Sequence, residues 1–234
     1  GWGWYALGNM PVVLGEFGTY YNYNVPREKP ADSPGYLAEL KAQYEIFSYP
    51  VAAEILDNYY EALETLSMSR MQWCFSAQND YFYGDWWNHE DFSMIDPEGD
   101  PRGHSAFARP YARAMSGKPL ASHFYSDHHY YDPDKGEVDP WHEFALVMGS
   151  KESDAPTEVF VPETQYPEGF YVWISDGFAD FDWAHRVLYW TPTRDEPGHE
   201  HSLRLLPPLP GEVNKGWRYF FKDGSVVDGD LSSL

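Results

Sequence analysis

The spacing of apolar positions changes once along the chain, and its first part has the period of a helix. Between residues 36 and 66, leucine and aromatic side chains recur at steps of three and four, which predicts one buried helical face. These positions are Leu37, Leu40, Tyr44, Phe47, Val51, Ile55, Tyr59, Leu63 and Leu66. Ser48 before Pro50 is a plausible helix start within this stretch, and Asp32 or Ser33 is another at its beginning.

Two short apolar segments flank the helical stretch. "PVVLGEFG" at residues 11–18 begins like a buried strand, and "MQWCFSA" at residues 71–77 also predicts a short buried strand. Strand, long loop, helix and strand is the order of elements typical of a parallel sheet or barrel. A second short helix is predicted at residues 103–115.

Beyond Lys118 the pattern is that of an antiparallel sheet protein. Short runs rich in Val, Tyr, Phe and Trp follow one another at about 10–15 residues, separated by Pro, Gly and Asp, which predicts a β-sandwich. These runs are "HEFALVMG", "TEVFVP", "GFYVWISDG", "RVLYWTP" and "HSLRLLP". "DPDKGEVDP" predicts a hairpin turn, "WRYFFKDGSVV" one more hairpin, and "DGDLSSL" a frayed end.

Composition narrows the class of protein. The 234 residues are 43% hydrophobic and 18% aromatic, too apolar for a disordered chain and enough for one large domain or two small ones. The net charge of −21, with no cluster of Lys or Arg, argues against a nucleic-acid partner. No apolar run reaches the roughly 18 residues of a transmembrane helix, and "GWGWYALGNM" lacks the basic start of a signal peptide. A single cysteine, Cys74, excludes an internal disulfide and leaves the localisation unknown.

The carboxylate of Glu16 is unexpected at the end of an apolar run. At the carboxyl end of a barrel strand it would project into the mouth where barrel active sites are built. Alternatively, Glu16 caps the next segment or pairs with an arginine. The loop "WCFSAQNDYFYGDWWNHEDFSMIDPEG" favours the first interpretation, because aromatic faces with Asn, Asp and Glu are the groups that bind sugars. Tyr20, Tyr21 and Tyr23 either line a groove for the aglycone or cover the rim of the barrel.

Three separate motifs carry a resemblance to a known family. "PVVLGEFG", "WCFSAQND…GDWWNHEDFSM" and "ARPYARAMSGKP" resemble the last two βα units of a glycoside hydrolase family 5 barrel, of the branch containing endoglycoceramidases and related β-glucosidases. The segment from "TEVFVPE" to "VLYWTP" resembles the β-sandwich that follows that barrel. The resemblance implies strands 7 and 8 of a (β/α)₈ barrel in residues 1–118, a sandwich in 119–215, and a tail or extra hairpin in 216–234.

The function implied by this resemblance is that of a retaining β-glycosidase acting on a β-glucoside or a glycolipid-type substrate. Glu16 occupies the motif of the family's nucleophile, and Trp73 matches the tryptophan that forms the floor of the sugar site. Asn79, Asp80, Asn88 and Glu90 lie in the following loop, where the family makes polar contacts with substrate. The resemblance implies no metal and no cofactor.

One part of the family's machinery is missing from this sequence. Retaining hydrolysis needs a second carboxyl group about 5–5.5 Å from the nucleophile, and the family carries it in an "NEP" motif that does not occur here. A whole barrel takes about 250 residues, so only two of its eight units fit before Lys118. We therefore expect the acid/base glutamate in a missing N-terminal part. The competing hypothesis is a non-catalytic sandwich that binds a glycan, lipid or protein.

The histidines and remaining acids give weaker signals. "HEH" at 199–201 and the pair His128 and His129 lack the H-E-x-x-H spacing of a zinc helix, and no metal site is expected there. Asp132, Asp134 and Asp139 lack the closing glutamate of a calcium loop, so a solvated turn is expected. Cys74 lies in an apolar run, where a cysteine usually packs as a small hydrophobic residue.

Overall fold

A computed structural model gives the fold of the chain in two compact units, Gly1–Phe107 and Ala108–Leu234. The residues that it describes are 5–6, 8, 10, 12–23, 35–87, 90–126, 131–132, 136–137, 142–194, 196–207 and 216–229. The division between the two units lies before the expected boundary at residue 118.

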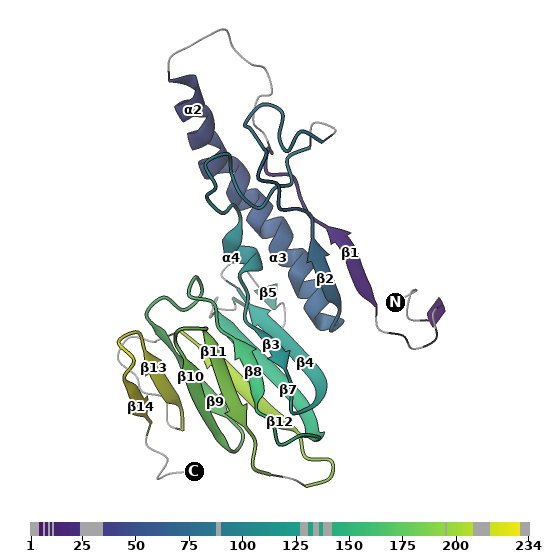
Figure 1. Cartoon of the computed structure of the whole chain (residues 1–234), viewed down its shortest axis with the longest axis vertical. Helices are drawn as coiled ribbons and strands as arrows, with labels where there is room; N and C mark the ends of the chain where they lie inside the picture. The colour runs from purple at the N-terminus through teal and green to yellow at the C-terminus, as the bar shows by residue number, and fades with distance from the viewer. Residues whose placement is uncertain are drawn as a thin grey trace. The chain divides into compact units, whose positions relative to one another are not determined.

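The first unit is built on two parallel strands joined through a long helical segment. Strand β1 (Val13–Phe17) pairs in parallel with β2 (Ser69–Gln72), and the two lie side by side in Figure 1 with α3 next to them. The helical elements between them are α2 (Tyr36–Gln43), the π-helical turn η1 (Tyr44–Ser48) and α3 (Tyr49–Thr65). The predicted helix over 36–66 and the order strand, helix, strand are confirmed.

The helical segment runs without a break through Ser48, and its buried face changes there. Pro50 lies in the first turn of α3, while the Ser48 hydroxyl donates to the Tyr21 carbonyl at 2.5 Å and forms no cap. A π-helical turn holds one more residue than an α-turn, so it rotates the face that follows it. Leu40, Tyr44 and Leu63 are buried as predicted, but between Tyr44 and Leu63 the buried apolar positions are Ala52, Ala53 and Leu56. The predicted positions Leu37, Phe47, Tyr59 and Leu66 are exposed.

One face of the strand pair packs on α3. The Phe17 ring meets the Tyr60 ring edge to face at 5.2 Å, and the Tyr60 hydroxyl donates to Gln72 Oε1 at 2.9 Å. The Arg70 guanidinium lies over the same tyrosine ring at 4.5 Å. Alternate residues point to opposite faces of a strand, so the residues between them face the other side.

The opposite face of the strand pair is open in the described part of the chain. Val13 is 51% exposed, Met71 61% and Phe75 68%. The expectation that residues 71–77 form a buried strand is therefore wrong in two respects. The strand ends at Gln72, and its apolar side chains on this face are not covered.

The predicted helix over 103–115 is also wrong beyond its first turn. Only α4 (His104–Phe107) is helical, and β3 (Tyr111–Ala114) pairs antiparallel with β8 (Thr157–Phe160). "YARAM" contains good helix formers, but pairing with a neighbouring strand overrides such local preference. The second unit therefore begins with a strand that the sequence assigned to a helix.

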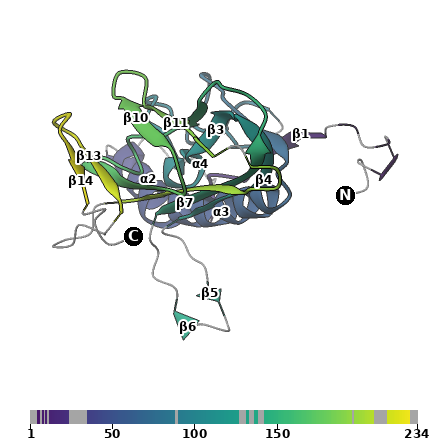
Figure 2. The ribbon, with the colours of Figure 1, turned by 90° about the horizontal axis from the view of Figure 1, so that it is seen from below.

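The second unit consists mainly of two antiparallel sheets. The four-stranded sheet has the order β10-β11-β8-β3 and the six-stranded sheet β14-β13-β9-β12-β7-β4. The further strands are β4 (Gly117–Tyr125), β7 (Glu143–Lys151), β9 (Gly169–Ile174), β10 (Phe178–Asp182), β11 (Val187–Thr191), β12 (His201–Leu206), β13 (Arg218–Phe221) and β14 (Val226–Asp228). Figure 2 shows the sheets as two layers.

One hydrophobic core lies between the two sheets. It joins side chains of the six-stranded sheet, such as Phe144 and Phe170, to side chains of the four-stranded sheet, such as Val159 and Trp190. The alternation along β7 and β12, buried then partly exposed, is the period of strands that face a core on one side. The five predicted apolar runs all contain strands of these two sheets.

The smaller hairpins are also present. β13 and β14 form the predicted hairpin of "WRYFFKDGSVV", and β13 joins β9 in the larger sheet. β5 (Tyr131–Asp132) and β6 (Gly136–Glu137) pair antiparallel, as "DPDKGEVDP" predicts. His128, His129, Asp134 and Asp139 lie outside the described residues. Within the described residues, no helix combines the length and apolar character needed to cross a membrane.

Candidate active site

A β-bulge near the end of β1 presents Glu16 on the open face of the strand pair. Leu14 lies opposite Arg70 and Phe17 opposite Gln72, so two residues of β1, Gly15 and Glu16, lie opposite one residue of β2, Met71. Leu14 and Phe17 are partly buried, whereas Gly15 and Glu16 between them are exposed. A bulge commonly redirects a side chain in this way at the rim of a sheet. The carboxylate therefore stands on the side away from α3.

Gly18 brings the end of β1 against the backbone that follows β2. A Cβ at residue 18 would lie 2.3 Å from the Trp73 carbonyl oxygen and 3.1 Å from the Phe92 ring. The Trp73 N–H donates to the Phe17 carbonyl at 2.8 Å, and the Trp73–Cys74 peptide bond is cis. The second glycine of "GEFG" is thus required by the close approach of two backbones.

Glu16 and Trp73 line the same hollow surface, which we call the Glu16 cleft. It consists of two adjoining hollows of about 550 Å³ and about 420 Å³, which share Glu16, Trp73 and Trp87. The first hollow is also lined by Gly15, Met71, Gln72, Cys74, Phe75, Ser76 and Asp85, and the second by Phe17, Gly18, Glu90 and Phe92. Carboxylates and broad aromatic faces therefore surround one open space.

The loop after β2 is held by its own polar side chains. The Asp80 carboxylate accepts from the N–H groups of Phe82 and Tyr83, both at 2.7 Å. Asn79 Nδ2 donates to the Ser76 carbonyl at 2.8 Å and to the Ile95 carbonyl at 3.1 Å. Such side-chain to backbone bonds are the usual way in which Asp and Asn fix a turn.

The predicted site residues divide accordingly. The structure brings Glu16, Trp73 and Glu90 to the Glu16 cleft. Asn79 and Asp80 line neither hollow, and their side chains bind the loop backbone. Asn88 lies outside the described residues.

The three tyrosines after β1 also differ. Tyr21 is fully buried, next to α3 and the ring of Tyr49. Tyr20 is 39% exposed and packs against Phe92, with their centroids 4.4 Å apart. The Tyr23 hydroxyl is hydrogen-bonded to that of Thr19 at 2.8 Å. None of the three lines either hollow of the Glu16 cleft.

Two residues of the cleft were not singled out from the sequence. Trp87 is 63% exposed and lines both hollows. The Asp85 carboxylate accepts from the Trp87 N–H at 3.2 Å and from the Cys74 thiol at 3.6 Å. Burial, together with the nearby charge of Asp85, raises the pKa of Cys74 to about 12. The run "GDWW" at residues 84–87, in a loop rich in aromatic and acidic residues, is the sequence signal that could have identified both.

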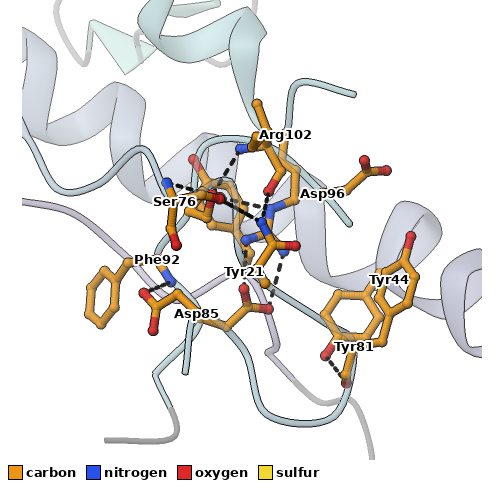
Figure 3. Close-up of polar contacts among 12 residues, drawn as sticks. Tyr21, Tyr44, Ser76, Tyr81, Asp85, Phe92, Asp96 and Arg102 are labelled. Carbon is orange, nitrogen blue, oxygen red and sulfur yellow. Dashed lines mark hydrogen bonds and ion pairs between the residues drawn. The ribbon is translucent and has the colours of Figure 1, made fainter. Parts of the chain in front are cut away.

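A buried ion pair between Arg102 and Asp91 lies next to the loop that lines the cleft. Arg102 donates to both oxygens of Asp91, at 2.5 and 3.2 Å, and its Nε donates to the Ser93 carbonyl at 2.8 Å. The guanidinium also lies 4.5 Å from the centre of the Tyr21 ring, and the Tyr21 N–H donates to the Asp91 carbonyl at 2.7 Å. Figure 3 labels Arg102 and Tyr21 among the polar contacts of this region. The pair thereby joins the segment after β1 to the loop after β2.

The comparisons with known proteins concern both units. Residues 109–205 match the sequence model of the glycoside hydrolase family 5 C-terminal domain. The chain is 26% identical over 227 residues to a glucosylceramidase of Rhizopus delemar, an alignment that covers 87% of this chain and 28% of the relative. It is 35% identical over 69 residues to the ergosteryl-beta-glucosidase of Saccharomyces cerevisiae, covering 30% of this chain and 9% of the relative.

Solved structures share the fold. Sterylglucosidase 1 of Cryptococcus neoformans superposes with a TM-score of 0.66 at 18% identity, over 86% of this chain and 29% of that chain. Endo-glycoceramidase II from Rhodococcus sp. superposes with a TM-score of 0.54 at 18% identity, over 88% of this chain and 35% of that chain. The chain thus spans about a third or less of the length of these proteins.

These findings agree with the motifs on which the resemblance rests. Residues 109–205 match the glycoside hydrolase family 5 C-terminal domain, and the chain resembles the C-terminal part of family 5 enzymes of the branch that includes endoglycoceramidases and related β-glucosidases.

Proposed function

We propose that this chain is the C-terminal part of a retaining β-glycosidase, with Glu16 as its nucleophile. In this proposal β1 and β2 are strands 7 and 8 of a (β/α)₈ barrel, and the two antiparallel sheets are the β-sandwich that follows it. The observation that carries the proposal is that Glu16 and Trp73, from the ends of two parallel strands, line one cleft. Barrel enzymes assemble their sites from the carboxyl ends of their strands in this way.

The open face of the strand pair supports the barrel part of the proposal. Val13, Met71 and Phe75 are each more than half exposed, on a face that the described residues leave uncovered. An isolated two-stranded parallel pair with an apolar face is not a stable arrangement in water. The six missing βα units of a barrel would cover this face, and they would also bring the acid/base carboxyl group opposite Glu16.

The relatives support a glycosidic substrate. A glucosylceramidase and an ergosteryl-beta-glucosidase are similar in sequence, and a sterylglucosidase and an endoglycoceramidase share the fold. One of the solved structures of the Rhodococcus sp. enzyme is a lactosyl-enzyme intermediate. A covalent glycosyl-enzyme is the intermediate of a retaining mechanism. We infer a β-glucoside or glycolipid-type substrate, stacked on Trp73 and Trp87, with Glu90 available for hydrogen bonds to hydroxyl groups.

The test uses the protein completed with its N-terminal part. Glu16→Gln should reduce hydrolysis of an aryl β-glucoside by several orders of magnitude and leave inhibitor binding nearly unchanged, because it keeps the shape and removes the nucleophile. Glu39→Gln is the matched control, since Glu39 is an exposed glutamate of α2 that lines neither hollow. Normal activity of Glu16→Gln would exclude this role.

A second measurement separates catalysis from binding. Glu16→Ala in the presence of azide should produce the α-glycosyl azide, because azide enters from the face that the carboxylate leaves vacant. A completed chain that binds glycosides but yields no azide adduct and no hydrolysis would favour the competing hypothesis of a non-catalytic binding module. Six upstream βα units with an "NEP" motif are expected in the coding sequence, and an unrelated upstream domain would contradict the proposal.

A further inference from the structure

The second unit contains a cluster of metal-binding side chains that plays no part in the proposed glycosidase site. Asp176, His199 and His201 each offer one ligand atom, and these atoms lie within 4.8 Å of one another. Among the described residues, this is the one group of three such side chains that comes so close together. All three belong to the family 5 C-terminal domain.

Strand pairing brings Asp176 and His201 together. β9 and β12 are antiparallel, with Ile174, the last residue of β9, opposite Leu203. In the same register, Asp176, two residues after Ile174, comes opposite His201, two residues before Leu203. The backbone pairing continues beyond β9, because the Ser175 N–H donates to the Ser202 carbonyl at 2.9 Å. His201 Nδ1 then lies 2.7 Å from Asp176 Oδ2.

The Asp176 carboxylate is held so that one oxygen faces the histidines. Its Oδ1 accepts from the N–H groups of Thr193 and Arg194, at 2.7 and 2.9 Å. The buried Trp190 fixes the backbone, since its indole N–H donates to the Asp176 carbonyl at 2.9 Å. The other oxygen, Oδ2, lies 2.7 Å from His201 Nδ1 and 3.8 Å from His199 Nε2. A single oxygen is therefore within reach of both imidazoles.

Both imidazoles retain a buried nitrogen without a partner. The side chain of His201 is fully buried, and its Nε2 makes no hydrogen bond. The Nε2 atom of His199 is also buried and makes no hydrogen bond, although 21% of the His199 side chain is exposed. A buried polar atom without a partner is costly and indicates a missing water or ion. His199 Nε2 and His201 Nδ1, which face the same oxygen of Asp176, are with it a ligand set typical of zinc.

We propose that Asp176, His199 and His201 bind one zinc ion that fixes the β9–β10 turn to the start of β12. Ligand atoms on one zinc stand about 3.3 Å apart, because metal–ligand distances are about 2.0–2.2 Å, so side-chain shifts of about an ångström complete the site. The partial exposure of His199 gives the ion access from solvent, and a water molecule takes the fourth position. The ion satisfies His199 Nε2, a buried nitrogen that otherwise has no hydrogen-bond partner.

Zinc titration of the 234-residue chain, first freed of metal with a chelator, tests this proposal. We expect one zinc per chain by calorimetry, no comparable binding of Mg²⁺, and a thermal unfolding midpoint of the sandwich that rises with zinc concentration. His199→Ala should weaken zinc binding more than tenfold, since loss even of groups behind the ligands costs about 10–100-fold. The metal-free variant should keep its sheet circular dichroism.

His185→Ala is the matched control. His185 Nδ1 also lies 2.7 Å from an aspartate oxygen, Asp182 Oδ2, but the described residues offer this exposed pair no third ligand. Its zinc affinity should equal that of the unchanged chain. A second readout needs no variant: with Co²⁺ in place of zinc, two exchangeable imidazole N–H signals should show paramagnetic shifts. Absence of stoichiometric zinc binding, or equal affinity in His199→Ala, would overturn the proposal and leave a histidine–aspartate hydrogen bond with a buried water.

Discussion

Gly18 lies so close to the backbone of Trp73 that a Cβ at residue 18 would stand 2.3 Å from the Trp73 carbonyl oxygen. This contact joins the residue after β1 to the residue after β2. Since the carbonyl belongs to a backbone already bonded to Phe17, it has little freedom to withdraw. The relative positions of the Glu16 carboxylate and the Trp73 ring therefore depend on a glycine at 18.

We predict that Gly18→Ala loosens the first unit. Forcing a methyl group into this contact should cost about 1–3 kcal/mol, which raises the population of the locally open state at least about fivefold. The rate of limited proteolysis within residues 1–107, relative to the second unit, measures this opening. Gly15→Ala is the control, because a Cβ at residue 15 meets no atom within 4 Å. Equal cleavage rates for the two variants would contradict the prediction.

The Trp73 ring should provide binding energy for the sugar. In the completed protein, Trp73→Ala should weaken binding of an iminosugar inhibitor by about 1 kcal/mol or more through lost stacking. Trp86→Ala is the matched control, because Trp86 is 61% exposed in the same loop region and lines neither hollow of the cleft. Calorimetric titration of both variants measures the difference. If inhibitor affinity is the same in Trp73→Ala as in the unchanged protein, Trp73 does not form the sugar platform.

The Asp91–Arg102 pair should dominate the stability of the loop that carries the cleft. Asp91→Asn leaves a buried guanidinium without its counter-charge, which typically costs about 3–5 kcal/mol. Proteolysis of residues 1–107 should accelerate accordingly, and the Trp73 environment should change in near-ultraviolet circular dichroism. Asp154→Asn breaks an exposed pair with Lys151 at 2.7 Å and should change neither readout. If Asp91→Asn behaved like Asp154→Asn, the pair would have no such supporting role.

The lone thiol reports on the fold of the same loop. Burial and the Asp85 carboxylate raise the pKa of Cys74 to about 12, so the thiol stays protonated at pH 8 and reacts slowly. We expect alkylation by iodoacetamide to be at least tenfold slower in the folded chain than in denaturant. Asp85→Asn should speed the reaction, since it removes the carboxylate that opposes thiolate formation. An equally fast reaction in the folded and denatured chain would show that this environment is not maintained.

The parts of this fold that could be predicted from sequence are those with local patterns. The helical stretch from residue 36, the five apolar runs of the sheets and the β13–β14 hairpin all follow from short-range periodicity. The failures have physical causes that such patterns do not contain. The π-helical turn before Tyr49 shifted the buried positions in the first part of α3, and pairing with β8 made a strand of Tyr111–Ala114.

Only those residues of the candidate site that lie in recognisable sequence motifs could be predicted. Glu16 and Trp73 were found because "PVVLGEFG" and "WCFSAQND" resemble family motifs, and both line the cleft. The roles of Asn79 and Asp80 in holding the loop depend on backbone partners that the sequence does not name. Asp176 and His201 are 25 residues apart and meet through the register of β9 and β12. No spacing rule for metal ligands would have joined them.

The exposed side chain of Val13 allows a last prediction, which tests the proposal that β1 and β2 belong to a barrel. In this chain Val13 is 51% exposed, so Val13→Ser should reduce binding of a dye for exposed apolar surface without accelerating proteolysis. In the completed protein the same residue would face the barrel interior. There, replacing a packed isopropyl group with a hydroxyl should cost about 1–3 kcal/mol. The same substitution is therefore harmless in one context and destabilising in the other.

Leu120→Ser controls for this change of context. Leu120 is a 44% exposed leucine of β4 in the second unit, so its replacement should have the same small effect in both proteins. Thermal unfolding of the completed protein and of the 234-residue chain, each with both variants, gives the comparison. A context-dependent loss for Val13→Ser alone means that upstream residues cover the open face of β1 and β2. If Val13→Ser did not lower the thermal stability of the completed protein, that face would not be the inside of a barrel. The barrel that is proposed to bring a second carboxyl group opposite Glu16 would then be excluded.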